Sequence, residues 1–365
     1  MARKAGVLSS TAIVALIENG GVVAGEPVGA AQIQPASLDL RLGPRAFRVR
    51  ASFLPGRESV SAKIARLGMH EIDLASGAVL ERGCVYIVPL MESLALAPDI
   101  AAHANPKSST GRLDIFTRLI TDEAHEFDRV RRGYRGPLYA EVSPRTFSIV
   151  VRAGSRLNQL RFKRGDPGYS DRALQRLHDE RRLIEGEVGG KGFAGGLPLT
   201  VDLAGDGEGL VGWKAKRHTD LIDLDAVGRY EPDDFWEPIA HPSGGGVILN
   251  PDDFYILASK ESVRIPPDHA AEMVAYDTLV GEFRAHYAGF FDPGFGHDEA
   301  GAAGTRAVLE VRSHDVPFVI EDGQIIGRLL FEPLTERPAD LYGHGIGSSY
   351  QRQGLALAKQ FKRPA

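Results

Sequence analysis

Short runs of apolar residues, several of them alternating with polar ones, follow one another along most of the chain. Successive side chains of a strand point to opposite faces, so alternation with a period of two predicts β-strands. Glycine, proline, asparagine and aspartate separate these runs at the spacing typical of all-β sandwiches and barrels. The clearest strands are expected at residues 85–90, 138–142, 147–152, 254–257, 308–311 and 317–320.

Helical patterns are sparse by comparison. We expect helices at residues 10–19 and 171–182, and shorter ones at 98–104 and 267–273, where a proline occupies a plausible first turn. Residues 184–196 are rich in glycine and are expected to form a linker or a loop. This stretch places a domain boundary near residue 185.

A tandem repeat underlies the strand pattern, because residues 79–162 recur at 247–331. One constant offset in numbering relates Tyr86, Glu92, Ser93, Pro98, Asp99, Glu141, Gly154 and Phe162 to Tyr255, Glu261, Ser262, Pro267, Asp268, Glu310, Gly323 and Phe331. Loop lengths stay equal over so many turns when one structural unit is used twice. We therefore expect a mainly β fold with two units, residues 1–185 and 186–365.

The two copies differ at one turn. The first copy has Lys107, Ser108, Ser109, Gly111 and Arg112, whereas the second has Tyr276, Asp277, Thr278, Val280 and Gly281. Two hydroxyl groups, backbone amides in a glycine-containing turn and flanking cations suit a phosphate chain. A polar turn without a ligand is the alternative. A turn that served only folding should persist in both copies, although drift after duplication would also explain the difference.

Glu141 stands among apolar or small residues of the strand expected at 138–142. Loss of hydration raises the pKa of a carboxyl group into the range that suits proton transfer, whereas a nearby arginine lowers it. The sequence leaves two roles open, a general base or a carboxylate paired with arginine at a subunit contact. Glu310 repeats the residue in the second copy and fits both roles.

Charge and hydrophobicity narrow the function classes. With 43% hydrophobic residues the chain has an ordinary globular composition, and no apolar run reaches the roughly 18 residues needed to cross a bilayer. A formal net charge of −5 disfavours nucleic-acid binding as the main task. Basic residues nevertheless gather between 129 and 164, where they suit an anionic ligand or form a solvated basic face.

Metal-binding patterns are missing from the sequence. The single cysteine, Cys84, excludes an internal disulfide and a cysteine-rich zinc site, and the histidines lack ligand spacing. No phosphate-binding loop of the nucleotide-hydrolase type and no Gly-x-Ser-x-Gly motif occurs. We expect a cytoplasmic protein that neither spans a membrane nor holds a metal with its own side chains.

Four stretches together resemble the dCTP deaminase family, relatives of the trimeric dUTPases. Residues 33–43, Ile-Gln-Pro-Ala-Ser-Leu-Asp-Leu-Arg-Leu-Gly, are similar to the family's opening signature. Residues 107–112 match its Arg-Ser-Ser-x-x-Arg motif with lysine first, and residues 133–136 match its Gly-aromatic-x-Gly hairpin before Glu141. The family's closing tail resembles the last stretch, with Phe331, Glu332, Pro333, Leu334, Tyr342, Tyr350, Gln353 and Gly354.

The resemblance implies that each unit is a dUTPase-like distorted jelly roll or β-barrel with a few short helices. It also implies a homo-oligomer with trimer-like packing of the repeats and active sites where units meet. In the second copy, residues 292–296 preserve the family's Asp-Pro-Gly-aromatic hairpin. The first copy is expected to lack a closing tail, because the helix at 171–182 follows it instead.

For function, the resemblance implies hydrolytic deamination of dCTP to dUTP and ammonia without zinc. Glu141 is then the expected general base, while Ser108 and Arg112 position water and stabilise the tetrahedral intermediate. Glu310 is the alternative base, facing Ser108 and Arg112 across an interface between copies. Mg2+ would be carried on the nucleotide triphosphate. Substrate contacts are expected from Lys107, Ser109, Asp128, Arg129, Tyr134, Tyr342 and Gln353.

Two other functions remain open. One is dUTP pyrophosphatase activity, alone or combined with deamination, because the same fold can direct water at the α-phosphate. The other is a non-catalytic nucleotide-binding β assembly in which Ser108 and Arg112 only hold an anion. Release of pyrophosphate, or binding without turnover, distinguishes these alternatives from deamination.

Overall fold

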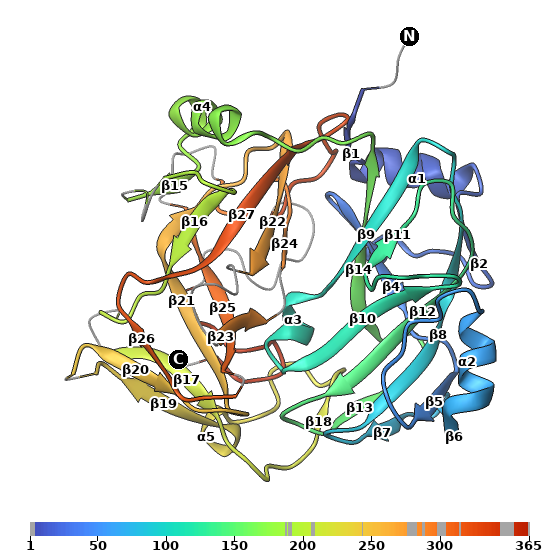
Figure 1. Cartoon of the computed structure of the whole chain (residues 1–365), viewed down its shortest axis with the longest axis horizontal. Helices are drawn as coiled ribbons and strands as arrows, with labels where there is room; N and C mark the ends of the chain where they lie inside the picture. Colours follow the sequence, from blue (N-terminus) through green and yellow to red (C-terminus); the bar gives the residue numbers. More distant parts are fainter. Residues whose placement is uncertain are drawn as a thin grey trace. The chain divides into compact units, whose positions relative to one another are not determined.

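The computed structural model describes residues 4–186, 188, 192–205, 209–242, 244–275, 283–286, 289–297, 304–313, 315–343 and 354–363. Strands dominate it, as the alternating pattern predicts (Figure 1). The chain divides into two compact units, the first comprising Met1–Pro167, Asp220–Arg229 and Leu334–Ala339, and the second Gly168–Thr219, Tyr230–Pro333 and Asp340–Ala365. No described helix is long and apolar enough to cross a membrane.

The first unit contains two six-stranded sheets and a small third one. One sheet has the order β11–β9–β14–β4–β3 with β1 on β14: β1 (Gly6–Val7), β3 (Ile33–Gln34), β4 (Ser37–Arg41), β9 (Ile100–Pro106), β11 (Arg129–Val130) and β14 (Arg156–Arg164). The other has the order β10–β12–β8–β5–β6 with β2 on β8: β2 (Val22–Ala24), β5 (Arg45–Val49), β6 (Gly68–Asp73), β8 (Val85–Ala95), β10 (Ile115–Thr121) and β12 (Arg135–Pro144). The small sheet is β18–β13–β7: β7 (Ala78–Leu80), β13 (Ile149–Val151) and β18 (Ile222–Asp223).

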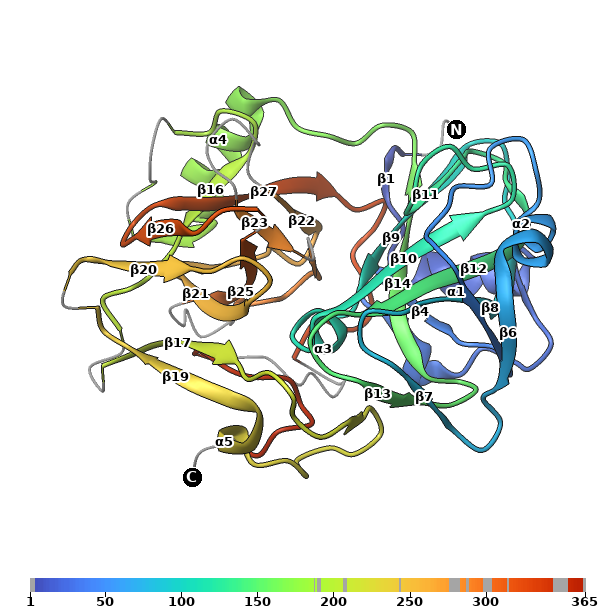
Figure 2. The same ribbon diagram turned by 60° about the horizontal axis from the view of Figure 1, so that its bottom comes forward.

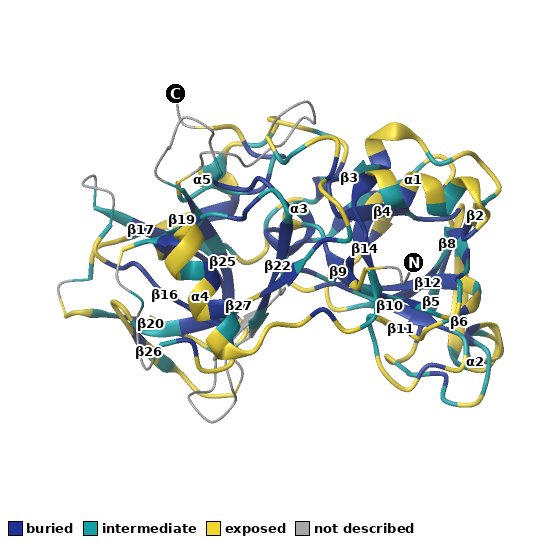
Figure 3. Ribbon diagram, turned by 90° about the horizontal axis from the view of Figure 1, so that it is seen from above, coloured by how far each residue is buried: buried dark blue, intermediate teal, exposed yellow. Residues whose placement is uncertain are grey.

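The main core of this unit draws on both large sheets. Leu38 and Leu160 come from one sheet, and Leu94, Leu119 and Leu138 from the other. Strands such as β9 and β14 are therefore mostly buried, whereas the helices keep an exposed side (Figure 3). A smaller apolar cluster covers the outer face of the second sheet, where helix α2 (Val60–Leu67) packs.

The second unit repeats this plan. Its larger sheet has the order β19–β17–β21–β25–β23 with β15 on β21, and β17 and β19 run side by side (Figure 2): β15 (Ile184–Glu185), β17 (Leu210–Ala215), β19 (Trp236–Ala240), β21 (Phe254–Val263), β23 (Phe283–His286) and β25 (Thr305–Ser313). The opposing sheet is β16–β27–β22–β24: β16 (Leu197–Thr200), β22 (His269–Ala275), β24 (Phe290–Phe291) and β27 (Ile325–Pro333). A two-stranded sheet pairs β20 (Gly246–Leu249) with β26 (Phe318–Glu321).

Strand pairing confirms the tandem duplication at the level of register. Glu141 of β12 lies opposite Ile87 of β8, and Glu310 of β25 lies opposite Ile256 of β21. The same constant offset that the sequence shows relates both members of these pairs. Because a slip of one residue would turn every side chain to the other face, a shared register means that both units bury equivalent positions.

Two of the expected helices are strands. Most of residues 98–104 and 267–273 lie in β9 and β22, which pair along their whole length with β14 and β27. The prolines lie in turns that precede these strands. Hydrogen bonding to the neighbouring strands outweighs the local preference for a helix. Among the described residues, the helices are α1 (Ser10–Glu18), α2, α3 (Ser108–Gly111), α4 (Asp171–Arg181), α5 (Pro232–Phe235) and the 3-10 turn η1 (Ala30–Gln32).

The units divide at Pro167 and Gly168, earlier than the boundary expected near residue 185. Helix α4 belongs to the second unit, because Leu174 and Leu177 pack in its core. It precedes β15 as α1 precedes β2, and these two strands pair with equivalent positions of β21 and β8. The helix at 171–182 therefore opens the second copy and does not replace a tail of the first.

Candidate functional site

The polar turn singled out in the sequence begins at Lys107 and continues as the one-turn helix α3. It is anchored to β14, because the backbone amide of Lys107 and Oγ1 of Thr110 donate to the carbonyl oxygen of Leu157 at 2.9 and 3.0 Å. Ser108 is exposed and Ser109 half-buried. The backbone of the turn is thus fixed while Ser108 is exposed at its surface.

Lys107 joins two motifs that lie far apart in the sequence. Its ammonium group donates to Oδ2 of Asp39, from the Pro-Ala-Ser-hydrophobic-Asp stretch, and Nη1 of Arg156 lies 3.5 Å from the same oxygen. Asp39 is buried, whereas Lys107 is partly exposed. A buried carboxylate paired in this way fixes the position of the lysine beside the turn. Both motifs were recognised in the sequence, but the contact between them could not be predicted from it.

Arg112 ends the turn and is only 3% exposed, so its side chain lies in the interior of the first unit. A buried guanidinium group is rarely tolerated without interactions, and Arg112 has them. Of the three expected catalytic side chains, Ser108 is therefore at the surface and Arg112 beneath it.

Glu141 lies on β12 opposite Arg118 of β10 and is 1% exposed. Nε and Nη2 of Arg118 donate to Oε1 of Glu141 at 3.1 and 2.6 Å, while Oε2 has no hydrogen-bond partner among the described residues. The guanidinium group also lies over the rings of Phe127 and Phe116, at 3.4 and 4.6 Å from their centroids. This arginine belongs to the neighbouring strand of the same unit and not to a subunit contact, and the role of Glu141 as a general base stays a prediction.

Asp128 follows in the loop before β11, with a left-handed φ of 62°. Its Oδ1 accepts the backbone amide of Leu119 at 2.7 Å. Burial raises the pKa of Asp128 to about 7, although this hydrogen bond and the charge of Arg118 oppose the shift. The neighbouring Arg129 is exposed, so the two expected ligand residues differ in their surroundings.

Tyr134, the aromatic residue of the first hairpin, lies in the core. Its hydroxyl group donates to the carbonyl of Pro137 at 2.7 Å and accepts the amide of Asp122 at 3.2 Å. Burial raises its pKa to about 12. These contacts hold the hairpin together around a side chain that is 1% exposed, and the contact with substrate expected for Tyr134 stays a prediction.

In the second unit, Glu310 is 5% exposed and lies opposite Ile256 and His286. The residues that replace the polar turn, 276–281, lie outside the described part of the chain. Glu310 therefore occupies the position of Glu141, with histidine at the register position of Arg118.

The start of the closing tail contacts the second hairpin. The backbone amide of Tyr342 donates to the carbonyl of Pro293 at 2.8 Å, and its ring lies 5.5 Å from that of Phe295. Gly294 has a φ of 93°, and a Cβ atom there would lie 2.8 Å from that of Leu341. The hairpin and the start of the tail are thus in direct contact. Gln353 lies outside the described residues.

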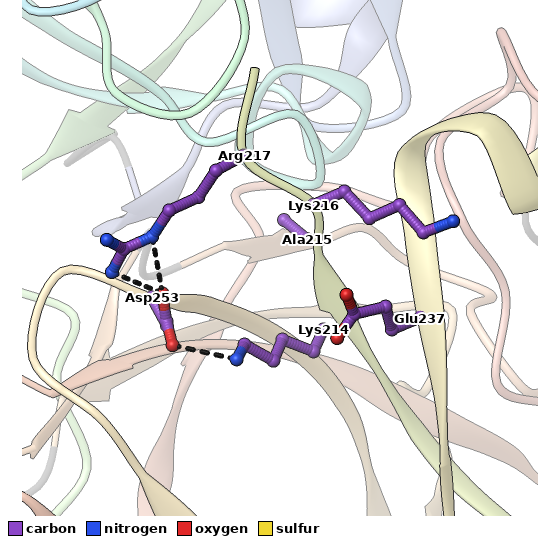
Figure 4. Close-up of a pocket in the computed structure, with 6 residues that line it drawn as sticks. All are labelled: Lys214, Ala215, Lys216, Arg217, Glu237 and Asp253. Carbon is purple, nitrogen blue, oxygen red and sulfur yellow. Dashed lines mark hydrogen bonds and ion pairs between the residues drawn. The ribbon is translucent and has the colours of Figure 1, made fainter. Parts of the chain in front are cut away.

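A charged cleft of about 390 Å³ in the second unit had no signal in the sequence (Figure 4). Nζ of Lys214 and Nη2 of Arg217 lie 3.0 and 2.8 Å from the two carboxylate oxygens of Asp253. Burial alone would raise the pKa of Asp253, but these hydrogen bonds bring it below its usual value. Asp253 thus offsets part of the positive charge of Lys214 and Arg217 in this cleft. It is lined by Lys214, Ala215, Lys216, Arg217, Glu237 and Asp253.

Comparison with known proteins identifies both units. The model of the 2'-deoxycytidine 5'-triphosphate deaminase N-terminal domain matches residues 4–166, and that of its C-terminal domain matches residues 170–361. A crystal structure of 2'-deoxycytidine 5'-triphosphate deaminase from Agrobacterium tumefaciens is 54% identical, with a TM-score of 0.87. That similarity covers 91% of this chain and 100% of the other. The two matched domains also meet where the structure divides.

More distant relatives match one part of the chain. A dCTP deaminase, dUMP-forming, from Halobacterium salinarum is 33% identical over 136 residues, which is 36% of this chain and 65% of the relative. A dCTP deaminase from Haloarcula marismortui is 29% identical over 161 residues, or 43% of this chain and 79% of the relative. From the two matched domains and the shared fold, the chain belongs to the 2'-deoxycytidine 5'-triphosphate deaminase family.

Proposed function

We propose that this chain hydrolyses dCTP to dUTP and ammonia. The observation that carries the proposal is the turn at Lys107, which concentrates hydrogen-bond donors and is fixed by Asp39 and Leu157 within a fold of the deaminase family. Donors held in place before the substrate arrives need no reorganisation, and this favours binding of a triphosphate.

In the proposed reaction a carboxylate accepts a proton from water, and the oxygen of that water bonds to C4 of cytosine. The tetrahedral intermediate then loses its amino group as ammonia, after the same carboxylate returns the proton to the nitrogen. Ser108 would position the water, and the charge of Arg112 would stabilise the intermediate. The two candidate carboxylates are Glu141 and Glu310.

Substrate contacts are assigned by position. Lys107 and Ser109 would bind the phosphates, which carry Mg2+ as part of the substrate. Asp128 and Arg129 would lie on the side of the base, and Tyr342 and Gln353 would belong to a tail that closes over the nucleotide. Tyr134 supports the hairpin. A homo-oligomer and a cytoplasmic location complete the proposal.

The direct test is ammonia release from dCTP with Mg2+. Replacing Lys107 with methionine should raise KM about tenfold with little change in kcat, because the lysine contacts the phosphates in the ground state and the transition state alike. Lys63→Met, on helix α2, is the matched control and should leave both constants unchanged. Binding of dCTP without any turnover would contradict the proposal.

Release of dUMP is a second candidate outcome, because the Halobacterium relative is named dUMP-forming. Water would then attack a phosphate after deamination, and one pyrophosphate would appear for each ammonia. Measuring both products in one reaction separates the activities: ammonia alone indicates a deaminase, and equal amounts indicate both reactions.

A further inference from the structure

The two units differ in the pairing of one pair of equivalent strands. In the first unit, β13 pairs with β7 on one side and, in parallel, with β18 on the other (Figure 1). The counterparts in the second unit are β26 and β20, which the constant offset of the repeat relates to β13 and β7. Among the described residues β26 pairs with β20 alone. One edge of β26 is therefore open where its counterpart holds a third strand.

Backbone hydrogen bonds attach β18 to the edge of β13. The amide of Ile222 donates to the carbonyl of Ser148 at 2.9 Å, and the amide of Leu224 donates to the carbonyl of Val150 at 3.2 Å. The added segment is short and extended, and main-chain groups make these contacts whatever its sequence. The edge of β13 thus accepts a strand through its backbone.

An ion pair at the end of the edge selects this segment by charge. Nη1 and Nη2 of Arg152 donate to the two carboxylate oxygens of Asp223 at 2.7 and 2.8 Å, and Nη1 also donates to Asp225 at 2.8 Å. Two parallel hydrogen bonds between a guanidinium group and a carboxylate add geometric specificity to the attraction. The first unit therefore holds an extended segment with acidic side chains.

The open edge of β26 presents the same backbone groups. Residues directly opposite in an antiparallel pair exchange both hydrogen bonds or neither, so Val150, whose carbonyl faces β18, also directs its amide to that side. Val319 has the equivalent register position, opposite Ile248, and the carbonyl of Ile248 accepts Oη of Tyr255 at 3.4 Å. The amide and the carbonyl of Val319 therefore point to the open edge.

Side chains along this edge are exposed as well. Val316 and Val319 are 48% and 53% exposed, whereas their counterparts are Phe147, which is 1% exposed, and Val150, which is half-buried. Ile248 lies opposite Val319 on β20 and is exposed too. Proteins usually protect an open strand edge with charged side chains, and an apolar edge readily pairs with another strand. The edge of β26 is thus suited to accept one.

The charge at the end of this edge is reversed between the units. Glu321 stands at the repeat position of Arg152, and Asp315, at the other end of the edge, at that of Thr146. Both carboxylates are exposed and form no ion pair within the part of the chain that the structure describes. Opposite charges across an interface select a partner, and like charges exclude one. A segment that fits this edge carries lysine or arginine where β18 carries aspartate.

We infer that the open edge of β26 binds an extended, basic segment of another protein, added as a parallel strand in the way that β18 is added to β13. In complexes of this kind main-chain hydrogen bonds supply the affinity and side chains the specificity. Aliphatic side chains of the segment cover Val316 and Val319, and its basic side chain pairs with Glu321. A second copy of this chain fits less well, because it would bring two acidic edges together.

Two peptides with the sequence of residues 219–226 test the inference. One has this sequence unchanged, and the other has the substitutions Asp223→Arg and Asp225→Arg. Each is labelled with a fluorophore and titrated with the full chain, and the anisotropy is measured. The basic peptide should bind about tenfold more tightly than the unchanged one, and Glu321→Arg in the protein should abolish this preference. Absence of binding, or equal binding of both peptides to the wild-type protein, would overturn the inference.

The substitution Val319→Pro locates the binding. Proline removes the amide that pairs with the added strand, and an edge strand accepts proline where this amide points to solvent. The variant should melt near the wild-type temperature and no longer bind the basic peptide. Glu71→Arg, on the exposed edge strand β6, is the matched control and should leave binding unchanged. Unchanged binding to Val319→Pro contradicts the inference. So does a wild-type oligomer that Val319→Pro dissociates in sedimentation, because a second copy would then occupy the edge.

Discussion

The two repeats share their scaffold and differ in the groups that line it. Oη of Tyr86 accepts the amide of Glu81 at 3.0 Å, and Oη of Tyr255 accepts the amide of Asn250 at 2.9 Å. Donors and acceptors alike are related by the offset of the repeat. A residue that is the same in both copies can therefore be explained by its role in folding. Its presence in both copies does not by itself identify it as a catalytic residue.

Glu92 and Glu261 extend this comparison to charged residues. Oε2 of Glu92 accepts the amide of Arg41 at 2.8 Å, and Oε2 of Glu261 accepts the amide of Thr200 at 2.9 Å. Both carboxylates are buried and tie the long strand of one sheet to a strand of the other. The turn at Lys107 and the partner of Glu141 vary instead. The variable positions are thus the better guide to function in this chain.

Removing these two carboxylates should produce the largest loss of stability. Glu92→Ala is expected to cost about 3 kcal/mol, because it leaves Arg41 and Gln32 without their acceptor. Glu261→Ala should cost less, about 2 kcal/mol, because the groups that lose their acceptor, the amide and the hydroxyl group of Thr200, are uncharged. Urea unfolding measures both, with the exposed Glu71→Ala as control. If either variant costs less than about 0.5 kcal/mol, the range of an ordinary surface substitution, the equivalence of the two units is broken.

Asp128 should make the stability of the first unit depend on pH, and the substitution Asp128→Asn should remove this dependence. Its folded-state pKa of about 7 lies above the ordinary 3.8, so the folded protein binds more protons between these values and loses stability as the pH rises through them. Asp128→Asn keeps the acceptor for Leu119 and tolerates the positive φ. At pH 8 it should gain about 1–2 kcal/mol, allowing for partial exposure, and at pH 4 nothing. Thermal melts at both pH values decide this, with Asp166→Asn as the exposed control.

Equal effects are expected for the two tyrosines. Tyr86→Phe and Tyr255→Phe each remove one acceptor from a backbone amide at low exposure, which should cost about 1 kcal/mol. The two losses of stability should agree within about 0.5 kcal/mol, which is the range within which the effects of mutations at independent sites are additive. Such agreement would support the same role for both tyrosines. A cost for one variant only would show that the tyrosines have diverged in role.

The smallest effects should come from the helix caps. Oγ of Ser9 accepts the amide of Ala12 at 3.2 Å, and Oγ of Ser170 accepts that of Ala173 at 3.4 Å. Replacement by alanine should cost about 1 kcal/mol at Ser9 and about 0.5 kcal/mol at the more exposed Ser170. Aspartate in place of Ser170 should restore stability in chemical unfolding, whereas at the buried Ser9 it would face the carboxylate of Glu336 and should not. Failure of Ser170→Ala to affect the second unit would argue against equating α4 with α1.

Alternation and the repeat could predict the strands and the number of units, because both depend on spacing within the chain. The pairings that define the site could not be predicted. Lys107 and Asp39 are 68 residues apart and Arg118 and Glu141 are 23 apart, so only the sheet brings them together. The burial of Tyr134 could not be predicted for the same reason, since burial in the core depends on the opposing sheet. The unit boundary was placed late because a glycine-rich stretch is a weaker sign than the core into which α4 packs.

The strand β18 has a consequence for how such a chain can evolve. It pairs in parallel with β13 of the first unit, and Arg152 binds Asp223 beside it through two hydrogen bonds, yet its residues are encoded within the second copy. A gene cut after residue 167 would strip the amino-terminal half of this edge and of residues 334–339 as well. A fragment that ended at residue 167 would therefore lack two segments that belong to its own unit, and we expect it to be less stable than the same unit within the full chain.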